Sequence, residues 1–420
     1  MISKLSNMWD SSLNSVMKNS LNLFGSFFVA AAVNLVIIIL ISRNYDLSIA
    51  GLYFFAISFT KFFNFFINAG LSNYLISEVS KSNKQVSETI NLVLFIRVFL
   101  STFIVFVFLF VLPNLLDFEG SYFVCLIASI WVIVVQLSET FFSFFKGKER
   151  MDYIFISKIF SSAIILSFSG FFIFNEYPIF YVFVAYILGS IFDLCYGLLI
   201  SRKWGYKFSI VSLDNLFVSV NQWYAFFIAM LMIPFLYYLH EVILQFLKGP
   251  AQVAIFGAAF RIIMIVENIP SIFAVSVFPV VSKNSCSGFR KCYYKFISYM
   301  RLQFILSLFL CLFMLVFSKH IILIFFGSDY ISSVAILKWG TIAALFMYVD
   351  LLNDIFLFSV GKTIYVVASR FISIIVCISA NLLLVPEYGY YGSLASLIFT
   401  FVSLFLFKVL LIIFMTKVRR

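Results

Sequence analysis

The amino-acid sequence predicts an all-α polytopic membrane protein, with twelve transmembrane helices in two pseudo-symmetric six-helix bundles around a central cavity. The first observation is composition: 63% of the 420 residues are hydrophobic and only 11% are charged, more apolar surface than a water-soluble core can bury. The second is that the apolar runs are continuous and about 20 residues long, which favours helices over the alternating strands of a membrane barrel. The third is an internal repeat.

The repeat relates residues 147–177 to residues 361–388. Each copy opens with Gly-Lys, continues with Tyr-x-x-x-Ser and a basic residue, and closes an apolar helix with Glu-Tyr. The basic residue is Lys158 in the first copy and Arg370 in the second. Two similar halves are typical of alternating-access transporters. We therefore expect an N-terminal six-helix lobe over 1–208 and a C-terminal six-helix lobe over 209–420.

Twelve apolar segments are long enough to cross the bilayer, and the loops between them are short. In chain order they are 21–41, 51–76, 90–112, 121–145, 154–174, 178–200, 216–238, 253–281, 297–318, 332–358, 363–385 and 391–415. The second and eighth are long enough to tilt or to extend past the bilayer. Ahead of the first span, residues 1–20 have near-helical apolar spacing, which predicts a short helix on the inner membrane surface. The longest outer connection is expected around 239–252.

The distribution of Lys and Arg predicts the orientation. With the N-terminus inside, 18 of these residues fall in cytoplasmic segments, and only Arg43, Lys248 and Lys319 fall in the opposite loops. This positive-inside bias predicts that both termini are cytoplasmic. The net charge of +11 is then explained by topology and by contact with anionic membrane lipids. Nucleic acid is not an expected partner, because no soluble basic face is predicted.

Other classes of site find little support in the sequence. The six cysteines lie in spans or in a cytoplasmic loop, so no disulfide framework is expected. Gly361-Lys362-Thr363 resembles the end of a P-loop, but the first glycine of that motif would fall at Phe356, inside a span. The two histidines, His240 and His320, are far apart in sequence, and no metal-ligand spacing exists. We expect no cofactor, no metal and no catalytic set, and hence not an enzyme.

Polar residues inside the spans are the candidates for function. The second span carries Lys61, Asn64 and Asn68 near one helix face, and the eighth carries Arg261 and Asn268. A charge at the bilayer centre costs roughly 2.5–3.5 kcal/mol on insertion scales, so these cations should face a bundle interior or an aqueous cavity. Snorkelling or a structural ion pair is one explanation. We favour a cationic cavity lining on the substrate pathway, because corresponding helices of the two halves each carry a cation.

Four carboxylates within spans are candidates for ion coupling or gating. Asp350 and Asp354 share a face of the tenth span, and the 214-residue offset of the repeat maps Asn353 of that span to Glu139 in the fourth span. They could carry a coupling proton, balance the cations, form an inner gate, or only hydrogen-bond between helices. Glu267 lies deeper and is the preferred protonatable residue. Two further charged residues in spans are interpreted as structural: Arg97 and Asp193.

Three segments carry a resemblance to a known family. Residues 50–81 and 254–283 resemble the second-helix signature and its second-lobe partner in the O-antigen flippases (Wzx or RfbX type), within the polysaccharide transporter branch of the MOP exporter superfamily. Residues 382–392 resemble that family's loop before the last helix. The motifs are degenerate, but their order and spacing cover nearly the whole chain.

The resemblance implies a MATE-like fold with a V-shaped central cavity that the second and eighth helices line. It implies transfer of an undecaprenyl-pyrophosphate-linked oligosaccharide from the inner to the outer leaflet of the bacterial inner membrane. It also implies a proton or sodium ion as coupling ion, and an O-antigen polymerase and a chain-length regulator as further partners. On this interpretation Lys61 and Arg261 attract the pyrophosphate, and the asparagines of the same spans hydrogen-bond the sugars.

Two other functions remain open at this point. One is an ion-coupled small-molecule exporter of the MATE type, although the first span has no carboxylate of the kind that drug-exporting relatives use. The other is an O-antigen polymerase or ligase, which can be equally hydrophobic. The short outer connections and the two-lobe repeat argue against such an enzyme.

Overall fold

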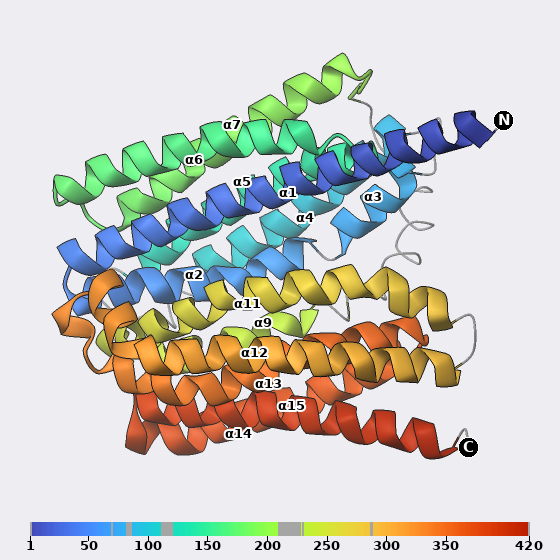
Figure 1. Cartoon of the computed structure of the whole chain (residues 1–420). Coiled ribbons are helices and arrows are strands. Elements are labelled where there is room, and N and C mark those ends of the chain that lie inside the picture. The colour runs from blue at the N-terminus through green and yellow to red at the C-terminus, as the bar shows by residue number, and fades with distance from the viewer. Residues whose placement is uncertain are drawn as a thin grey trace. The chain divides into compact units, whose positions relative to one another are not determined.

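The computed structural model describes residues 2–68, 70–80, 86–110, 121–208, 228, 231–285 and 289–418. This part of the chain consists of helices and turns and contains no strand, so the predicted all-α class is confirmed (Figure 1). Eleven helical segments of the described part are long and apolar enough to cross a membrane. They correspond to eleven of the predicted spans. The seventh predicted span, 216–238, lies mostly outside the described residues.

The chain forms two compact units that are not contiguous in sequence. Unit 1 comprises Met1–Asn44 and Phe62–Phe227, and unit 2 comprises Tyr45–Lys61 and Ile228–Arg420. The second helix is thus divided, with its first part in unit 2 and its last turns in unit 1. The lobe division expected at residue 208 falls next to residues outside the described ranges, and it stays a prediction.

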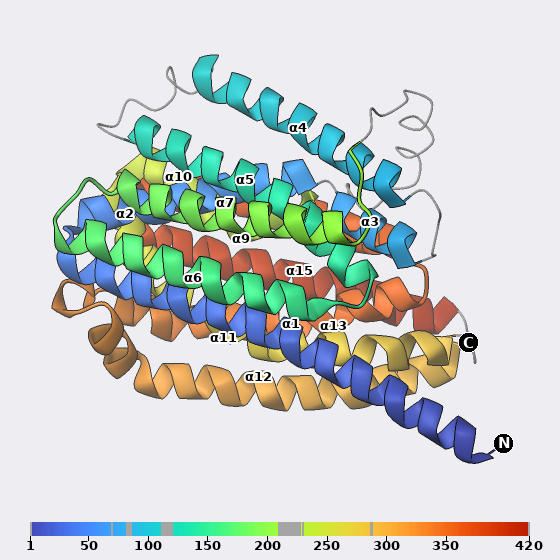
Figure 2. The same ribbon diagram turned by 90° about the horizontal axis from the view of Figure 1, so that it is seen from above.

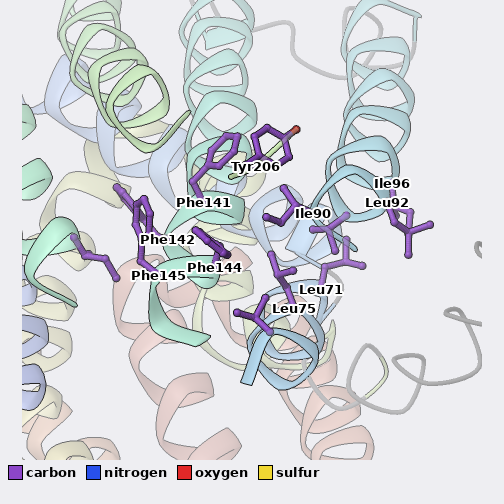
Figure 3. Close-up of a cluster of buried hydrophobic side chains, with 13 residues drawn as sticks. Leu71, Leu75, Ile90, Leu92, Ile96, Phe141, Phe142, Phe144, Phe145 and Tyr206 are labelled. Carbon is purple, nitrogen blue, oxygen red and sulfur yellow. The ribbon is translucent and has the colours of Figure 1, made fainter. Parts of the chain in front are cut away.

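Unit 1 is a bundle of long apolar helices. Its helices are α1 (Ile2–Asn44), the end of α2 (Leu47–Asn68), α3 (Leu71–Ser80), α4 (Val86–Phe110), α5 (Ser121–Gly147), α6 (Met151–Phe174) and α7 (Phe180–Lys203). The helix α6 packs between α1 and α7, and α5 packs on α7 and also contacts α3 and α4 (Figure 2). A buried cluster joins α3, α4 and α5, with Leu71, Leu75 and Ile90 facing Phe141 and Phe145 (Figure 3).

Unit 2 is built around α13, which packs against several other long helices. Its helices are the first part of α2, α9 (Ile233–Tyr237), α10 (Leu239–Lys248), α11 (Pro250–Ser285), α12 (Phe289–Phe325), the 3-10 helix η2 (Ser328–Tyr330), α13 (Ser333–Ser359), α14 (Thr363–Tyr388) and α15 (Tyr390–Val418). The helix α13 contacts α11, α12 and α15, α14 packs along α15, and the short α10 lies against α14 and α11. Phe296 and Phe356 stack at the centre of a buried cluster between α12 and α13, with ring centroids 4.4 Å apart.

Three segments differ from the sequence-based expectation. The N-terminal segment is not a separate helix, because it continues into the first span as the single helix α1, with no glycine or proline between residues 17 and 24 to interrupt it. The second span breaks before α3, where Gly70 has a left-handed φ of 74°. The connection at 239–252 is not an outer loop: α10 occupies it and buries one face, including His240, Glu241 and Leu244.

The internal repeat appears as two equivalent helices, α6 and α14. A left-handed residue precedes each of them, Glu149 with φ 56° and Gly361 with φ 71°. Each helix is also followed by a left-handed position, at Glu176 with φ 57° and Gly389 with φ 57°. The same turn chemistry therefore begins and ends corresponding helices of the two units.

Candidate functional site

Arg261 lies at the centre of a buried polar cluster in unit 2. Its Nη2 atom is 2.9 Å from Oε2 of Glu241 on α10, and it also donates to Ser58 Oγ at 3.0 Å and to the Phe54 carbonyl at 3.2 Å, both on α2. Ser58 Oγ donates to the same Glu241 oxygen. Glu241 is completely buried. Arg261 therefore joins α11 to α10 and to the first part of α2.

Close helix packing makes this cluster possible. A Cβ at Gly257 would lie 2.9 Å from the Phe54 ring and 3.2 Å from the second Glu241 oxygen, Oε1, so the absence of a side chain leaves room for both. The guanidinium of Arg261 lies 5.4 Å from the centroid of the Phe54 ring, a cation–π distance. A Cβ at Gly51 would lie only 1.8 Å from the Pro250 carbonyl oxygen, so glycine is required where α2 meets the start of α11.

Lys61 lies one turn beyond Ser58 on α2 and is half-buried. Among the residues that the structure describes, it has no hydrogen-bond or ion-pair partner. Lys61 and Arg261 are close enough for their charges to interact, and Glu241 pairs with Arg261, which leaves the three side chains with a net charge of +1. A set with net positive charge attracts an anion.

The predicted residues Asn64 and Asn68 make contacts within unit 1. Asn64 Oδ1 accepts a hydrogen bond from Gln136 Nε2 of α5. Asn68 Oδ1 accepts from the Ser72 backbone amide at 3.3 Å and from Arg97 Nη2 at 3.4 Å. The two side chains therefore fix the last turns of α2 to α3, α4 and α5, while the first part of α2 belongs to unit 2.

Arg97 is completely buried, and its contacts agree with the structural role that we expected. Nη1 donates to the Gln136 carbonyl at 2.5 Å and to Thr140 Oγ1 at 2.7 Å, and Nη2 donates to Ser72 Oγ at 2.7 Å. One guanidinium thereby ties α4 to α5 and to the first turn of α3. These bonds span the break between α2 and α3.

Glu267 and Asn268 lie about two turns beyond Arg261 on α11. Glu267 Oε1 accepts a hydrogen bond from the Tyr237 hydroxyl of α9 at 2.9 Å. Asn268 is exposed, and its amide donates to carbonyls of its own helix, Met264 and Ile265. The side chain of Asn268 is therefore available to a ligand, whereas Glu267 is held by a neutral partner.

Asp350 and Asp354 form an ion network with two cations, Arg370 and Lys408, that were not predicted to be their partners. Lys408 of α15 is completely buried; its Nζ atom contacts an oxygen of Asp350 and lies 2.6 Å from Asp354 Oδ1. Arg370 of α14 lies 2.8 Å from Asp354 Oδ2. Asn353 donates to Asp350 at 3.1 Å. Two carboxylates and two cations thus link α13, α14 and α15 with balanced charge.

The basic residues of the repeat both make ion pairs inside their units. Lys158 of α6 lies 2.6 Å from Asp193 of α7, as Arg370 of the second copy pairs with Asp354. Asp193 thus joins α7 to α6, and its structural role stays a prediction. Glu139 forms an ion pair of 2.5 Å with Lys146 on its own helix. The described residues contain no group of three or more His, Cys, Asp or Glu side chains that could hold a metal ion.

The ion-pair partners of the candidate site residues were not predicted from the sequence, although the site residues themselves were named. Glu241 was overlooked because the segment was interpreted as an outer loop. The apolar residues Leu239, Val242, Ile243 and Phe246 recur at helical spacing in this segment, which indicates an amphipathic helix. Lys408 was overlooked although a lone lysine in the middle of an apolar span is costly unless it is paired, which is the signal that could have identified it.

Comparisons with known proteins agree with this architecture. Residues 16–285 match the family described as polysaccharide biosynthesis protein. The lipid II flippase MurJ in an inward closed conformation matches with a TM-score of 0.76 and 16% identity, over 93% of this chain and 87% of that one. An inward-facing multidrug resistance MATE family transporter of the MOP superfamily matches with a TM-score of 0.75 and 12% identity, over 94% of this chain and 99% of that one.

A MOP superfamily transporter from Pyrococcus furiosus matches with a TM-score of 0.65 and 11% identity, over 94% of this chain and 95% of that one. No curated protein matches the chain. The TM-scores establish the fold. At identities this low, the substrate has to be argued from the residues of this chain. The fold is that of the MOP-superfamily transporters, as predicted.

Proposed function

Because this chain belongs to the polysaccharide biosynthesis protein family and has the MOP-superfamily fold, we propose that it is a flippase for a lipid-linked oligosaccharide. The cargo is an O-antigen repeat unit on undecaprenyl pyrophosphate, moved from the cytoplasmic to the periplasmic leaflet of the bacterial inner membrane. The positive-inside bias supports cytoplasmic termini. No covalent step is needed, since binding shifts the populations of inward- and outward-open states.

The observation that carries the proposal is the pair of cations at Lys61 and Arg261. A pyrophosphate offers several charged oxygens, and a guanidinium can bind two of them at once. In the structure, Glu241 occupies one such position on Arg261 at 2.9 Å, so substrate binding exchanges one anion for another. The exposed amide of Asn268 and the amide of Asn64 are proposed to hydrogen-bond the sugars.

For the coupling ion we propose Glu267 as the proton or sodium site. The other candidate carboxylates, Glu139, Asp350 and Asp354, are each ion-paired with a lysine or arginine. Protonating any of them would remove one carboxylate charge from a paired cation, which is costly where the cation is buried. Glu267 accepts its hydrogen bond from a tyrosine hydroxyl, so neutralising it leaves no cation unpaired.

The test is flipping of the purified lipid-linked repeat unit in proteoliposomes. Arg261→Gln and Lys61→Gln should each lower the rate at least about tenfold, because each removes a charge-assisted contact with the pyrophosphate. The matched control is Lys338→Gln, which changes an exposed lysine of α13 outside the cluster. Thermal unfolding checks that all variants are equally folded. Flipping by both cluster variants at the wild-type rate would then refute the cationic site.

A small-molecule exporter of the MATE type is the second candidate, supported by the similarity to a multidrug resistance transporter. The net positive charge around Lys61 and Arg261 disfavours cationic drugs. The same proteoliposomes distinguish the two functions: movement of an organic anion without movement of the lipid-linked glycan favours the exporter. The family and the fold are those of transport proteins, in agreement with the expectation that the chain is not an enzyme.

A further inference from the structure

An open groove lies over α13 in unit 2, between the helices α12 and α15. Its volume is about 550 Å³, within the usual range of ligand sites. It is lined by five residues of α12, among them Arg301, Phe304 and Ile305, and by Val349 of α13 and Phe405 of α15. Both flanking helices pack on α13, but they do not pack along each other (Figure 1). Because α11 contacts all three of these helices, the groove lies on the side of α13 that faces away from α11.

Arg301 is charged, whereas the other residues that line the groove are apolar. Its side chain is exposed, and it makes no hydrogen bond or ion pair among the residues that the structure describes. The nearby carboxylate of Asp350, next to Val349 in sequence, is buried and held by Lys408. A guanidinium on an apolar surface in a membrane is costly unless an opposite charge or water meets it. Arg301 therefore favours an anionic ligand at this end of the groove.

The position of Arg301 along α12 matches the level of lipid phosphates. Lys319 follows Arg301 by 18 residues on this helix, a rise of about 27 Å. The hydrocarbon core of a bilayer is about 30 Å thick, so the two cations lie near its opposite boundaries. Ser298, one turn before Arg301, is also exposed, whereas Phe304 lies one turn deeper. Polar groups at the membrane surface and apolar groups towards its centre follow the order of head and chain in a lipid.

The charge of α12 favours an anionic lipid over a zwitterionic one. The helix contains five Lys and Arg residues and no Asp or Glu. Four of the five lie within its first 13 residues, from Phe289 to Arg301. Clusters of this kind next to a membrane attract negatively charged lipid headgroups. The groove supplies what a basic surface lacks, because its apolar walls can hold one chain in a defined place.

We propose that this groove binds one anionic phospholipid. Its phosphate contacts Arg301 and the hydroxyl of Ser298, and one acyl chain lies along Phe304 and Ile305 between α12 and α15. With the N-terminus inside, as proposed above, this lipid belongs to the cytoplasmic leaflet. It fills the space where the two flanking helices do not meet, and so supports the packing of α12 on α13. The site uses neither Lys61 nor Arg261, and it does not depend on the proposed cargo.

The headgroup contact is tested by native mass spectrometry of the protein in detergent, with phosphatidylglycerol or phosphatidylcholine of the same chain length. The wild type should retain one phosphatidylglycerol in preference to phosphatidylcholine. Arg301→Gln should lower this affinity at least about fivefold, the value of one cation near a membrane surface, and Arg301→Lys should retain most of it. The matched control is Lys295→Gln, which removes the same charge from the same end of α12 at a residue that does not line the groove. Equal retention of the two lipids, or equal losses in the two Gln variants, would overturn the proposal in favour of general attraction to a basic helix.

The place of the chain is tested by cross-linking with a phosphatidylglycerol that carries a photoactivatable group on its acyl chain. Labelling should map to residues 297–305 of α12 and to the region of Phe405 on α15. Glycerol phosphate, which lacks the chains, should not compete. Labelling spread evenly over the lipid-facing helices would overturn the site. Displacement of the probe by an equal concentration of undecaprenyl phosphate would overturn a phospholipid as the occupant. Neither experiment measures transport, so a failure of the proposed flippase function would leave both results standing.

Discussion

At the scale of residues, the main finding is that most buried charges in the described part of the chain occur as pairs joining different helices, Arg97 with its neutral partners being the exception. Arg261 with Glu241, Lys158 with Asp193, and Lys408 with the carboxylates of α13 all follow this pattern. An ion pair in an apolar interior is costly to form and more costly to break, because one partner is then left charged without a counterion. These ion pairs therefore hold specific neighbouring helices against one another.

The ion pair between Glu241 and Arg261 gives the first prediction. Glu241→Gln leaves the guanidinium buried without a carboxylate and should destabilise the protein by about 3–5 kcal/mol. The double variant Glu241→Gln with Arg261→Gln should recover much of this loss and still fail to flip substrate. Thermal unfolding in detergent measures the stability, and a double-mutant cycle gives the coupling energy. Additive losses would mean that the two side chains do not interact.

Lys408 gives a second prediction at this scale. Lys408→Met removes the cation that contacts both Asp350 and Asp354. It should lower the stability of the protein by about 3–5 kcal/mol, since Asp350 loses its ion-pair partner and Asp354 keeps only Arg370. Lys338→Met, at an exposed position of α13, is the matched control and should leave the unfolding temperature unchanged. Equal unfolding temperatures for the two variants would show that the network contributes nothing to stability.

At the scale of elements, α2 has the most unusual position, because it contributes to both compact units. Its first part packs on the start of α11, where Gly51 meets the Pro250 carbonyl. Its last turns are held by Gln136 and Arg97 in unit 1. Lys61 lies at the end of the part assigned to unit 2. One helix thus carries Lys61, which has no ion-pair partner in the described part of the chain, and connects the two units covalently.

Gly51 tests the close packing of this helix. Gly51→Ala should destabilise the protein or separate α2 from α11, because the new Cβ would lie 1.8 Å from a backbone oxygen. Gly170→Ala in α6 is a matched control, since nothing lies within 4 Å of the added atom. That substitution should stabilise its helix by roughly 0.5–1 kcal/mol. Expression level and unfolding temperature compare the two, and a Gly51→Ala protein as stable as Gly170→Ala would contradict the packing described.

The sequence was sufficient to predict the elements whose signal is local. Eleven apolar spans, the repeated turns before α6 and α14, and the buried cations of α2 and α11 all follow from composition and spacing. The segment around α10 was predicted wrongly, because a short amphipathic helix buried on one face has the same polar content as a loop. The partners of Arg261, Asp350 and Asp354 depend on which helices are neighbours. A single sequence does not specify that, so Glu241, Arg370 and Lys408 were missed.

At the scale of the whole molecule, a transporter fold is combined with buried cations that suit the proposed anionic cargo. The fold is shared with flippases and drug exporters alike, so the function depends on the charges within the spans. Cations near Ser58 favour a pyrophosphate, and the ion networks of α13 to α15 make unit 2 a tightly linked body. We therefore expect these networks to stay intact during alternating access.

The most direct test of the central claim is deletion of the gene in its host, with analysis of undecaprenyl-pyrophosphate-linked glycans beside a lipopolysaccharide gel. If the protein is the proposed flippase, complete repeat units should accumulate on the lipid carrier in the cytoplasmic leaflet, and O-chains should be lost. Wild-type protein should restore the O-chains and Arg261→Gln should not. Normal O-chains in the deletion strain, or single repeats that reach the outer leaflet without polymerising, would contradict the proposed flippase.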